Sequence, residues 1–159
     1  MSADVSTTPA IRLLREKNAE FTIREYRYED RGGTAVAARE LGAEEHAVIK
    51  TLVFETDARA PFLVLMHGDR EVSAKNLARI LGVKSVVPCP PAVAERHTGY
   101  QVGGISPFGT RKKMPVYMER TLAGCARVWI NAGKRGRLAE MAPAEIIRIL
   151  EPILVEASV

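Results

Sequence analysis

The run from Gly99 to Gly109, Gly-Tyr-Gln-Val-Gly-Gly-Ile-Ser-Pro-Phe-Gly, cannot form the interior of a regular helix or strand. Its glycines permit positive φ angles and a close approach of the backbone to another group, while Pro107 biases Ser106 toward an extended conformation. Such a segment leaves backbone N–H groups that can face a ligand. By itself, however, a glycine-rich run is more typical of a simple turn than of a binding site.

Two further segments strengthen the case for a binding site. In Val48-Ile49-Lys50-Thr51-Leu52-Val53-Phe54, a lysine interrupts an otherwise apolar, strand-like stretch. That lysine either protects an edge strand and reaches the surface, or is a cation held over a pocket by a stiff scaffold. In Asn131-Ala132-Gly133-Lys134-Arg135-Gly136, two adjacent cations stand between glycines, a composition that suits contact with an oxyanion or a phosphate.

Together with the opening Thr8-Pro9-Ala10, these segments resemble the YbaK/EbsC family of freestanding aminoacyl-tRNA deacylases, which is related to the editing domain of bacterial prolyl-tRNA synthetases. The resemblance covers almost the whole chain and rests on the Lys50-Thr51 pair, the run from Thr98 to Gly109, and Gly133-Lys134-Arg135-Gly136. The most similar branch is that of the Cys-tRNA(Pro) deacylases. The family resemblance implies an α/β (α+β) fold, in which helices surround a mixed, curved, barrel-like β-sheet.

The resemblance also implies catalysis by positioning, without a protein nucleophile. Lys50, Gly103 and Gly104 would be the catalytic residues, because a lysine charge can favour a charged transition state and backbone N–H groups can polarise the ester carbonyl. The residues expected to bind the substrate are Tyr26, Thr51, Ile105, Ser106, Pro107, Asn131, Gly133, Lys134 and Arg135. The chain departs from the family pattern at Asn131, where the family has a serine, and near Leu138, where it has an aspartate.

The implied reaction is trans-editing, the hydrolysis of the aminoacyl ester of mischarged tRNA(Pro), above all Cys-tRNA(Pro), with assistance from the thiol of the substrate. The implied partners are the 3′ end of aminoacylated tRNA(Pro) and prolyl-tRNA synthetase. Two alternatives stay open: a deacylase for Ala-tRNA(Pro) or a broader set of esters that uses a held water, and a non-catalytic module that binds tRNA or a synthetase. A nucleotide-binding enzyme is disfavoured, because the glycine run has neither the Gly-x-x-x-x-Gly-Lys-Ser/Thr order nor a Gly-x-Gly-x-x-Gly turn.

Cysteine and histidine usage argues against a metal centre. Cys89 and Cys125 are too few and too far apart for a disulfide scaffold or a zinc site, and His46, His67 and His97 show no metal-ligand spacing. We therefore expect free thiols, no metal and no cofactor. The polar N-terminus and the lack of an apolar run of membrane-spanning length predict a cytoplasmic protein that does not enter a membrane.

Length and charge add two expectations. A chain of 159 residues that is 47% hydrophobic predicts one domain spanning residues 1–159. The net charge is +4, and cations gather at Arg111-Lys112-Lys113 and at Lys134-Arg135, beside the candidate loops. These cations are either a solvated surface cluster or a rim for the phosphates near a tRNA 3′ end.

Capping residues and hydrophobic periodicity predict alternating helices and strands. Helices are expected to begin near Thr8, Thr34, Ser73, Pro90 and Pro143. Strands are expected within residues 21–26, 48–54, 62–66, 85–87, 116–118 and 128–130. The segment 56–61 is expected to be the turn of a hairpin.

Overall fold

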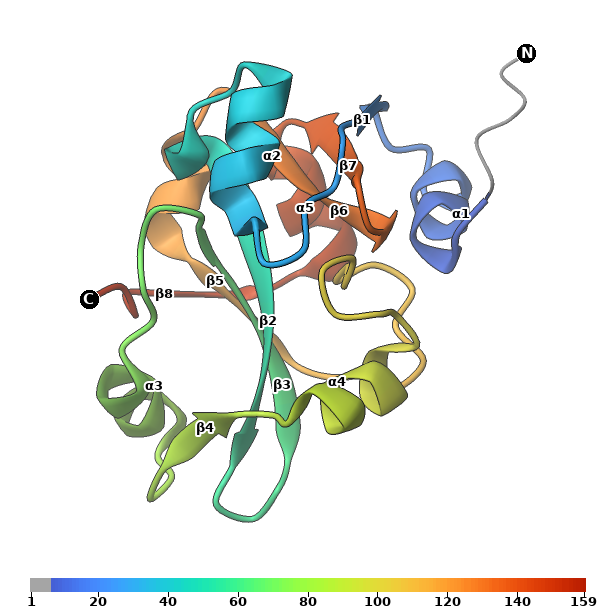
Figure 1. The fold of residues 1–159 in the computed structure, drawn as a ribbon. Coiled ribbons are helices and arrows are strands. Elements are labelled where there is room, and N and C mark those ends of the chain that lie inside the picture. Colours follow the sequence, from blue (N-terminus) through green and yellow to red (C-terminus); the bar gives the residue numbers. More distant parts are fainter. Residues whose placement is uncertain (1–6) are drawn as a thin grey trace.

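The computed structural model describes residues 7–159, in which five α-helices surround a mixed sheet of eight strands (Figure 1). The strands are β1 (Phe21–Glu25), β2 (Val48–Thr56), β3 (Pro61–His67), β4 (Val86–Pro88), β5 (Val116–Glu119), β6 (Val128–Lys134), β7 (Arg137–Met141) and β8 (Ile153–Val155). The helices are α1 (Pro9–Glu16), α2 (Gly33–Leu41), α3 (Ala74–Leu81), α4 (Pro91–Thr98) and α5 (Pro143–Leu150), with short 3-10 helices η1 (Glu45–Ala47) and η2 (Arg120–Gly124). Across residues 7–159, no helix is long and apolar enough to cross a membrane.

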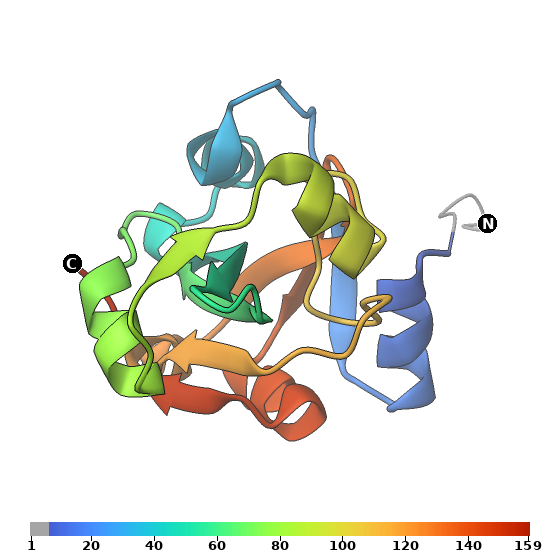
Figure 2. The ribbon, with the colours of Figure 1, turned by 90° about the horizontal axis from the view of Figure 1, so that it is seen from below.

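The strand order is β1-β7-β6-β2-β3-β5-β8, and β4 pairs with β2 outside this path. β2 and β3 form the expected antiparallel hairpin, whereas β2 is parallel to β6, β3 is parallel to β5, and β5 is parallel to β8. In the second view the strands curve around a shared interior and the helices lie around the outside (Figure 2). The mixed, curved sheet implied by the family resemblance is confirmed.

β2 has a partly unpaired edge, on the side that faces away from β3. β6 pairs with this side at Val48 and Ile49, and β4 pairs with it from Phe54 to Thr56. In the described part of the chain, no strand pairs with the segment between these two ladders. Because β6 and β4 come from distant parts of the sequence, only the folded chain creates this gap.

The alternation of hydrogen bonds shows which backbone groups face the gap. Leu63 N–H donates to Pro115 O, away from β2, so the N–H and C=O of its partner Val53 also point away from β3. Cys89 N–H donates to Val53 O, as this orientation requires. Thr51 lies two residues before Val53 and therefore has the same orientation, so both of its backbone polar groups point into the gap.

The side chains of β2 alternate between two hydrophobic clusters. Ile49 and Val53 belong to the larger cluster, together with the buried Leu65, Phe108 and Ile130. On the opposite face, Phe54 belongs to a smaller cluster with Phe62, Val64, Met66 and Leu77. Since β2 is packed on both faces, its unpaired edge is held on a rigid scaffold.

Helix boundaries follow the capping residues at most of the expected positions. The side chain of Ser73 accepts a hydrogen bond from Asn76 N–H at the start of α3, and Gly42 and Gly82 end α2 and α3 with φ of 65° and 72°. The expected cap at Thr34 is wrong, because Gly32 is the N-cap of α2. Thr34 lies inside the first turn, where its hydroxyl contacts the Glu45 carboxylate at 2.8 Å.

The sequence did not reveal β7 and β8. The strand expected within residues 128–130 is longer in the structure: Asn131 to Lys134 continue β6, and the chain turns at Gly136, whose φ is 79°, into β7. β7 is buried at Arg137, Leu138, Ala139 and Met141. A strand buried on both faces lacks the alternation of apolar and polar residues that identifies a strand in sequence.

Thr8 joins α1 to β6, and its replacement is predicted to destabilise the fold. The Thr8 hydroxyl accepts from Ile11 N–H at 3.1 Å and donates to Ala132 O at 2.6 Å in a buried position. Thr8→Ala is expected to lower the free energy of unfolding by about 1–2 kcal/mol, because a helix cap and a buried hydrogen bond are both lost. Urea denaturation measures this loss. Thr8→Ser should retain most of the stability, and equal stability of wild type and Thr8→Ala would contradict the prediction.

Candidate active site

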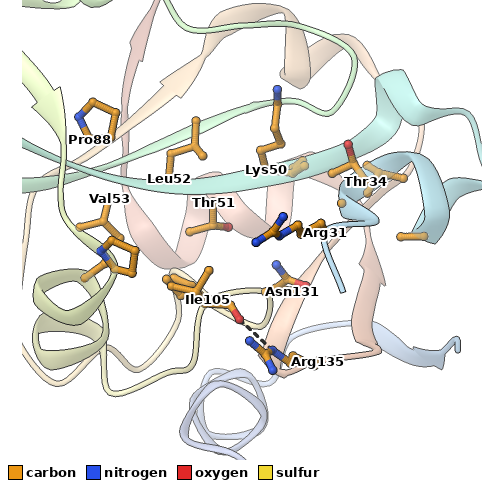
Figure 3. Close-up of a pocket in the computed structure, with 18 of the residues that line it drawn as sticks. Arg31, Thr34, Lys50, Thr51, Leu52, Val53, Pro88, Ile105, Asn131 and Arg135 are labelled. Carbon is orange, nitrogen blue, oxygen red and sulfur yellow. Dashed lines mark hydrogen bonds between the residues drawn. The ribbon is translucent and has the colours of Figure 1, made fainter. Parts of the chain in front are cut away.

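A cleft of about 690 Å³ lies along the unpaired edge of β2 (Figure 3). Its walls come from β2, the loop between β1 and α2, the glycine-rich run, β6 and its turn, and the start of α4. The expected site residues that line it are Tyr26, Lys50, Thr51, Gly103, Ile105, Asn131 and Arg135. This size is typical of a small-molecule binding site.

Lys50 lies on the opposite side of the edge from Thr51. In Figure 3 the Lys50 side chain points away from Ile105 and Asn131, whereas Thr51 lies on the same side as those residues. The Lys50 ammonium is 3.6 Å from the Glu71 carboxylate, and the two side chains are 21% and 82% exposed. Because this ion pair is long and its carboxylate is largely exposed to water, the pair is weak and the lysine charge is available to an anionic ligand. A ligand on this edge would therefore meet Lys50 on one side and Thr51 on the other.

The cleft also contains polar groups that have no partner. Thr51 Oγ1 is buried and makes no hydrogen bond. Within residues 7–159, the structure shows no hydrogen bond from the amides of Gly103 and Ile105, both of which line the cleft. With the Thr51 backbone groups, these atoms form a set of donors and acceptors ready for a ligand.

The structure places other expected site residues behind the cleft. Gly104 N–H donates to Gln101 O at 2.9 Å, so this amide is not free to polarise an ester as expected. A Cβ at Gly104 would lie 2.7 Å from Arg135 N, which shows that the glycine allows close packing of two backbone segments. Ser106 is fully buried, and its hydroxyl accepts from Phe108 N–H at 3.1 Å.

Pro107, Gly133 and Lys134 also lie outside the cleft lining. Pro107 is buried, and Lys134 is exposed in β6. A Cβ at Gly133 would lie 2.7 Å from the Tyr100 ring, so this glycine makes room for an aromatic side chain rather than for a ligand.

The sequence interpretation missed Tyr28, Asp30 and Arg31, which line the cleft from the loop after β1. Tyr28 follows Tyr26 at the two-residue spacing of an extended chain, which is the one local signal that could have identified it. Burial is the main cause that raises the pKa of Tyr26, which keeps its hydroxyl protonated as a hydrogen-bond donor. Arg31, Lys50 and Arg135 give the cleft its cations.

No pair of nucleophile and base lines the cleft within the described residues. Cys89 is the lining cysteine, but burial raises the pKa of its thiol to about 11, so the thiol stays protonated and weakly nucleophilic near neutral pH. Cys125, His46, His67 and His97 are not among the lining residues. The cleft can therefore position and polarise a ligand, but it offers no acyl-enzyme chemistry of the Ser-His or Cys-His kind.

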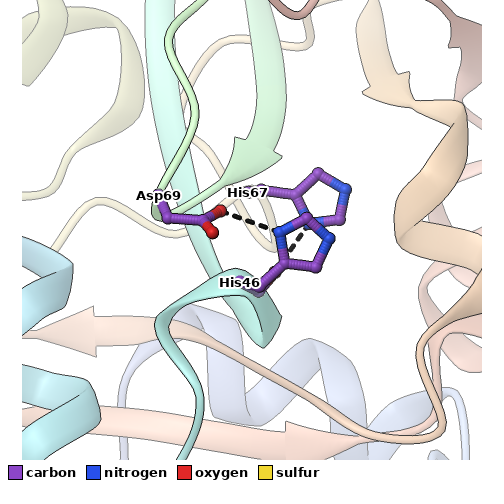
Figure 4. Close-up of side chains that lie close together, drawn as sticks. All are labelled: His46, His67 and Asp69. Carbon is purple, nitrogen blue, oxygen red and sulfur yellow. Dashed lines mark hydrogen bonds and ion pairs between the residues drawn. The ribbon is translucent and has the colours of Figure 1, made fainter.

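A cluster of His46, His67 and Asp69 lies outside the cleft (Figure 4). Sequence spacing did not reveal it, although potential ligand atoms of the three side chains lie within 4.8 Å of one another. His67 Nδ1 donates to His46 O at 2.6 Å, so His67 Nε2 accepts from the Thr121 hydroxyl at 2.6 Å. The two imidazole rings stack at 3.7 Å, and His46 Nδ1 pairs with Asp69 at 2.8 Å. Because these groups already satisfy one another, we interpret the cluster as a structural link between η1, β3 and η2.

This link predicts a loss of stability at acidic pH. Burial is the main cause that lowers the pKa of His67 below its ordinary value, and it outweighs the hydrogen bond to His46 O, which raises that pKa. The unfolded chain therefore binds a proton more readily, so the stabilisation is present above a pH of about 6.5 and is lost as the pH falls through the folded pKa. Urea denaturation at neutral pH and at about pH 5 should show a smaller acid-induced loss in His67→Gln than in wild type. An equal loss in both proteins would contradict the assignment.

Comparison with known proteins identifies the family of this cleft-bearing fold. A family model described as the aminoacyl-tRNA editing domain matches residues 29–149, which include the β2 edge, the glycine-rich run and the β6–β7 turn. The chain belongs to the aminoacyl-tRNA editing domain family. The family resemblance found in the sequence is thereby confirmed.

Individual proteins that are similar to this chain agree with the family assignment. EbsC of Enterococcus faecalis, named for a proposed Cys-tRNA(Pro)/Cys-tRNA(Cys) deacylase activity, is 31% identical over 143 residues, covering 89% of this chain and 87% of EbsC. A proline–tRNA ligase of Nitratidesulfovibrio vulgaris is 33% identical over 94 residues, covering 59% of this chain and 16% of the ligase. The solved structure of a proposed trans-editing enzyme for prolyl-tRNA synthetase matches with a TM-score of 0.83 and 23% identity, over 97% of this chain and 99% of that one. Family and relatives together indicate an aminoacyl-tRNA deacylase, as expected.

Proposed function

We propose that residues 1–159 act as one editing domain that removes cysteine from mischarged Cys-tRNA(Pro). One observation carries this proposal: the cleft has cations and unpaired backbone amides but, within the described residues, no pair of nucleophile and base. Such a site suits a substrate that brings its own nucleophile. The similarity to EbsC supports the cysteinyl ester, and the similarity to proline–tRNA ligases supports tRNA(Pro).

In the proposed reaction the thiol of the bound cysteinyl group attacks its own carbonyl carbon. A carbon–sulfur bond forms, the bond from that carbon to the ribose oxygen breaks, and the thiol proton passes to the ribose oxygen. The products are deacylated tRNA and a cyclic thioester, which water opens to free cysteine. The protein contributes orientation, which converts a slow intramolecular attack into a fast one by holding a reactive conformer.

In this proposal, the polar groups along the β2 edge each contact a different part of the substrate. The amides of Gly103 and Ile105, two residues that line the cleft, would stabilise the negative charge that develops on the carbonyl oxygen. Lys50 adds a positive charge from the other side of the edge, against a phosphate or the departing ribose oxygen. The hydroxyl and backbone groups of Thr51 would fix the amino acid between them.

A held water would support the alternative, hydrolysis of an alanyl ester. Asn131 and the unpartnered Thr51 Oγ1 both line the cleft and could hold that water. A single small substituent in such a pocket changes binding by only about 1–3 kcal/mol, so size alone separates alanine from cysteine weakly. The choice of the cysteinyl ester rests on the similarity to EbsC and on the thiol that this ester itself brings to the cleft.

Single-turnover deacylation of Cys-tRNA(Pro), Ala-tRNA(Pro) and Pro-tRNA(Pro) tests the proposal directly. Rapid loss of the cysteinyl ester, with slow loss of the other two, is the expected result. An S-methylcysteinyl ester is the matched control, because it has a similar shape but no thiol, and it should resist. Preferential loss of the alanyl ester would establish the water-using alternative, and stable binding without loss of any ester would establish a non-catalytic binding module.

Ser106 provides an internal test of the absent nucleophile. Its hydroxyl is buried and accepts from Phe108 N–H, so it serves the loop rather than the reaction. Ser106→Ala is expected to lose about 1 kcal/mol of unfolding free energy while kcat/KM stays within roughly threefold of wild type. Parallel deacylation and urea denaturation measurements check both parts. Loss of deacylation in a stably folded Ser106→Ala protein would restore a serine mechanism.

A further inference from the structure

Tyr28 and Arg135 form a stacked pair at one end of the cleft, although they come from distant segments. Tyr28 lies in the loop after β1, Arg135 lies in the β6–β7 turn, and both line the cleft. The guanidinium carbon of Arg135 is 5.1 Å from the centre of the Tyr28 ring, a distance typical of a cation held over an aromatic face. The pair thus brings an aromatic ring and a guanidinium together in the lining of the cleft.

The glycine-rich run fixes this pair in place. Arg135 Nε donates to Val102 O at 2.8 Å, the contact that Figure 3 marks with a dashed line. A Cβ at Gly103 would lie 2.5 Å from the Tyr28 hydroxyl oxygen and 3.1 Å from Arg135 Nε, so the loop backbone packs directly against both side chains. Any other residue at Gly103 would push the pair apart. The glycine therefore serves both the ester end of the cleft and the stacked pair.

Arg135 has binding capacity that the protein does not use. Within residues 7–159, the one hydrogen bond shown for its side chain is the Nε contact to Val102 O, and no carboxylate forms an ion pair with it. Arg135 and Tyr28 are both partly exposed. A guanidinium that is fixed in orientation, stacked and free at its terminal nitrogens matches a planar heterocycle better than it matches a carboxylate, because it offers a flat face together with edge donors.

We propose that the Tyr28–Arg135 pair is the subsite for the terminal nucleobase of the substrate, the adenine of the nucleoside that carries the ester. This inference rests on the proposed deacylation, since the ester is placed at the β2 edge. In Figure 3, Ile105 and Asn131 lie between Thr51 and Arg135, so the ribose would span them and its base would reach the stacked pair. Every base has a face that can stack on an aromatic ring or a guanidinium, so this contact does not depend on the tRNA sequence. The 3′-terminal nucleoside is also the same in all tRNAs.

Two synthetic substrates separate a base subsite from a phosphate contact. One is the cysteinyl ester of adenosine 5′-monophosphate, and the other carries hydrogen in place of the base on the same ribose 5-phosphate. Wild type is expected to deacylate the adenosine ester with a kcat/KM roughly tenfold or more above that of the abasic ester. Tyr28→Leu and Arg135→Ala should each reduce this ratio toward one. Tyr28→Phe, which keeps the ring, should retain it, as should Lys75→Ala in α3, a surface charge on a different helix.

A binding measurement makes the test independent of turnover. A short single-stranded RNA that ends in 2-aminopurine loses fluorescence when its base stacks, and wild type is expected to quench it while Tyr28→Leu and Arg135→Ala do not. Quenching without hydrolysis would keep the base subsite and reject the proposed deacylation. Hydrolysis without quenching, or an equal loss of rate on the adenosine and abasic esters in both variants, would overturn the subsite and identify Arg135 as a phosphate contact or a structural residue.

Discussion

Replacing Lys50 with alanine is expected to lower kcat/KM for the cysteinyl ester by roughly 10²- to 10³-fold, because the positive charge proposed to act on the substrate from the other side of the β2 edge is lost. β2 is packed on both faces and holds this lysine at its unpaired edge, so little reorganisation is needed when the substrate binds. The stability of the fold should change little, since the ion pair is 3.6 Å long and its Glu71 carboxylate is exposed. Single-turnover deacylation and urea denaturation of the same preparation separate the two effects.

Two control variants define the role of the Lys50 charge. Lys50→Arg keeps the charge but changes its shape and should recover part of the rate. Glu71→Gln removes the competing carboxylate, so KM should fall or stay equal while kcat is unchanged. Full activity of a folded Lys50→Ala protein would reject the lysine as a catalytic residue and would favour its other interpretation, a cation that protects an exposed strand edge.

Replacing Gly104 with alanine is expected to damage both the fold and the reaction. The added Cβ would lie 2.7 Å from Arg135 N and 2.8 Å from Lys134 C, so it would meet backbone atoms that cannot rotate away. The glycine-rich run must then move off the β6–β7 turn, at a cost of about 1–3 kcal/mol in the free energy of unfolding. The same movement displaces the neighbouring amides of Gly103 and Ile105, and a misplacement of about 1 Å can lower the rate by roughly 10²-fold.

Gly124→Ala is the matched control for this prediction. A Cβ at Gly124 meets no heavy atom within 4 Å, so alanine fits there without movement of the chain. Both proteins are compared by urea denaturation and by deacylation of the cysteinyl ester. If Gly104→Ala resembles Gly124→Ala in both measurements, then the close packing of the two backbone segments does not hold the loop in its active position.

Much of the fold could be predicted because its signals are local. Ser73 and Gly82 mark the ends of α3 through contacts within a few residues, and the apolar runs of β2 and β3 flank a short turn. β7 could not be predicted in the same way, because it is buried at most positions and so lacks an alternating pattern. The elements that bury β7 are distant from it in sequence, so no local sequence pattern predicts its burial.

The residues of the candidate site likewise differ in whether a local sequence pattern identifies them. Lys50 and the glycine-rich run stand out in the sequence, since a charge in an apolar strand and a cluster of glycines both violate the local pattern. Tyr28 and Arg31 do not, because an aromatic or a cation in a polar loop is ordinary. Ser106 also lies in a conspicuous segment, but the structure buries its side chain, which accepts a hydrogen bond from Phe108 N–H.

The sequence by itself determined the elements that depend on nearest neighbours: the helix caps, the β2–β3 hairpin, the flexible glycine-rich run and the lysine within β2. Only the tertiary structure decided that β6 and β4 pair with the two ends of one β2 edge and leave Thr51 between them unpaired. It also decided that Arg135 stacks on Tyr28. The physical reason is that a gap at a strand edge and a contact between distant loops both depend on pairing between segments far apart in the sequence. The residues at the gap do not themselves determine which strands pair beside them.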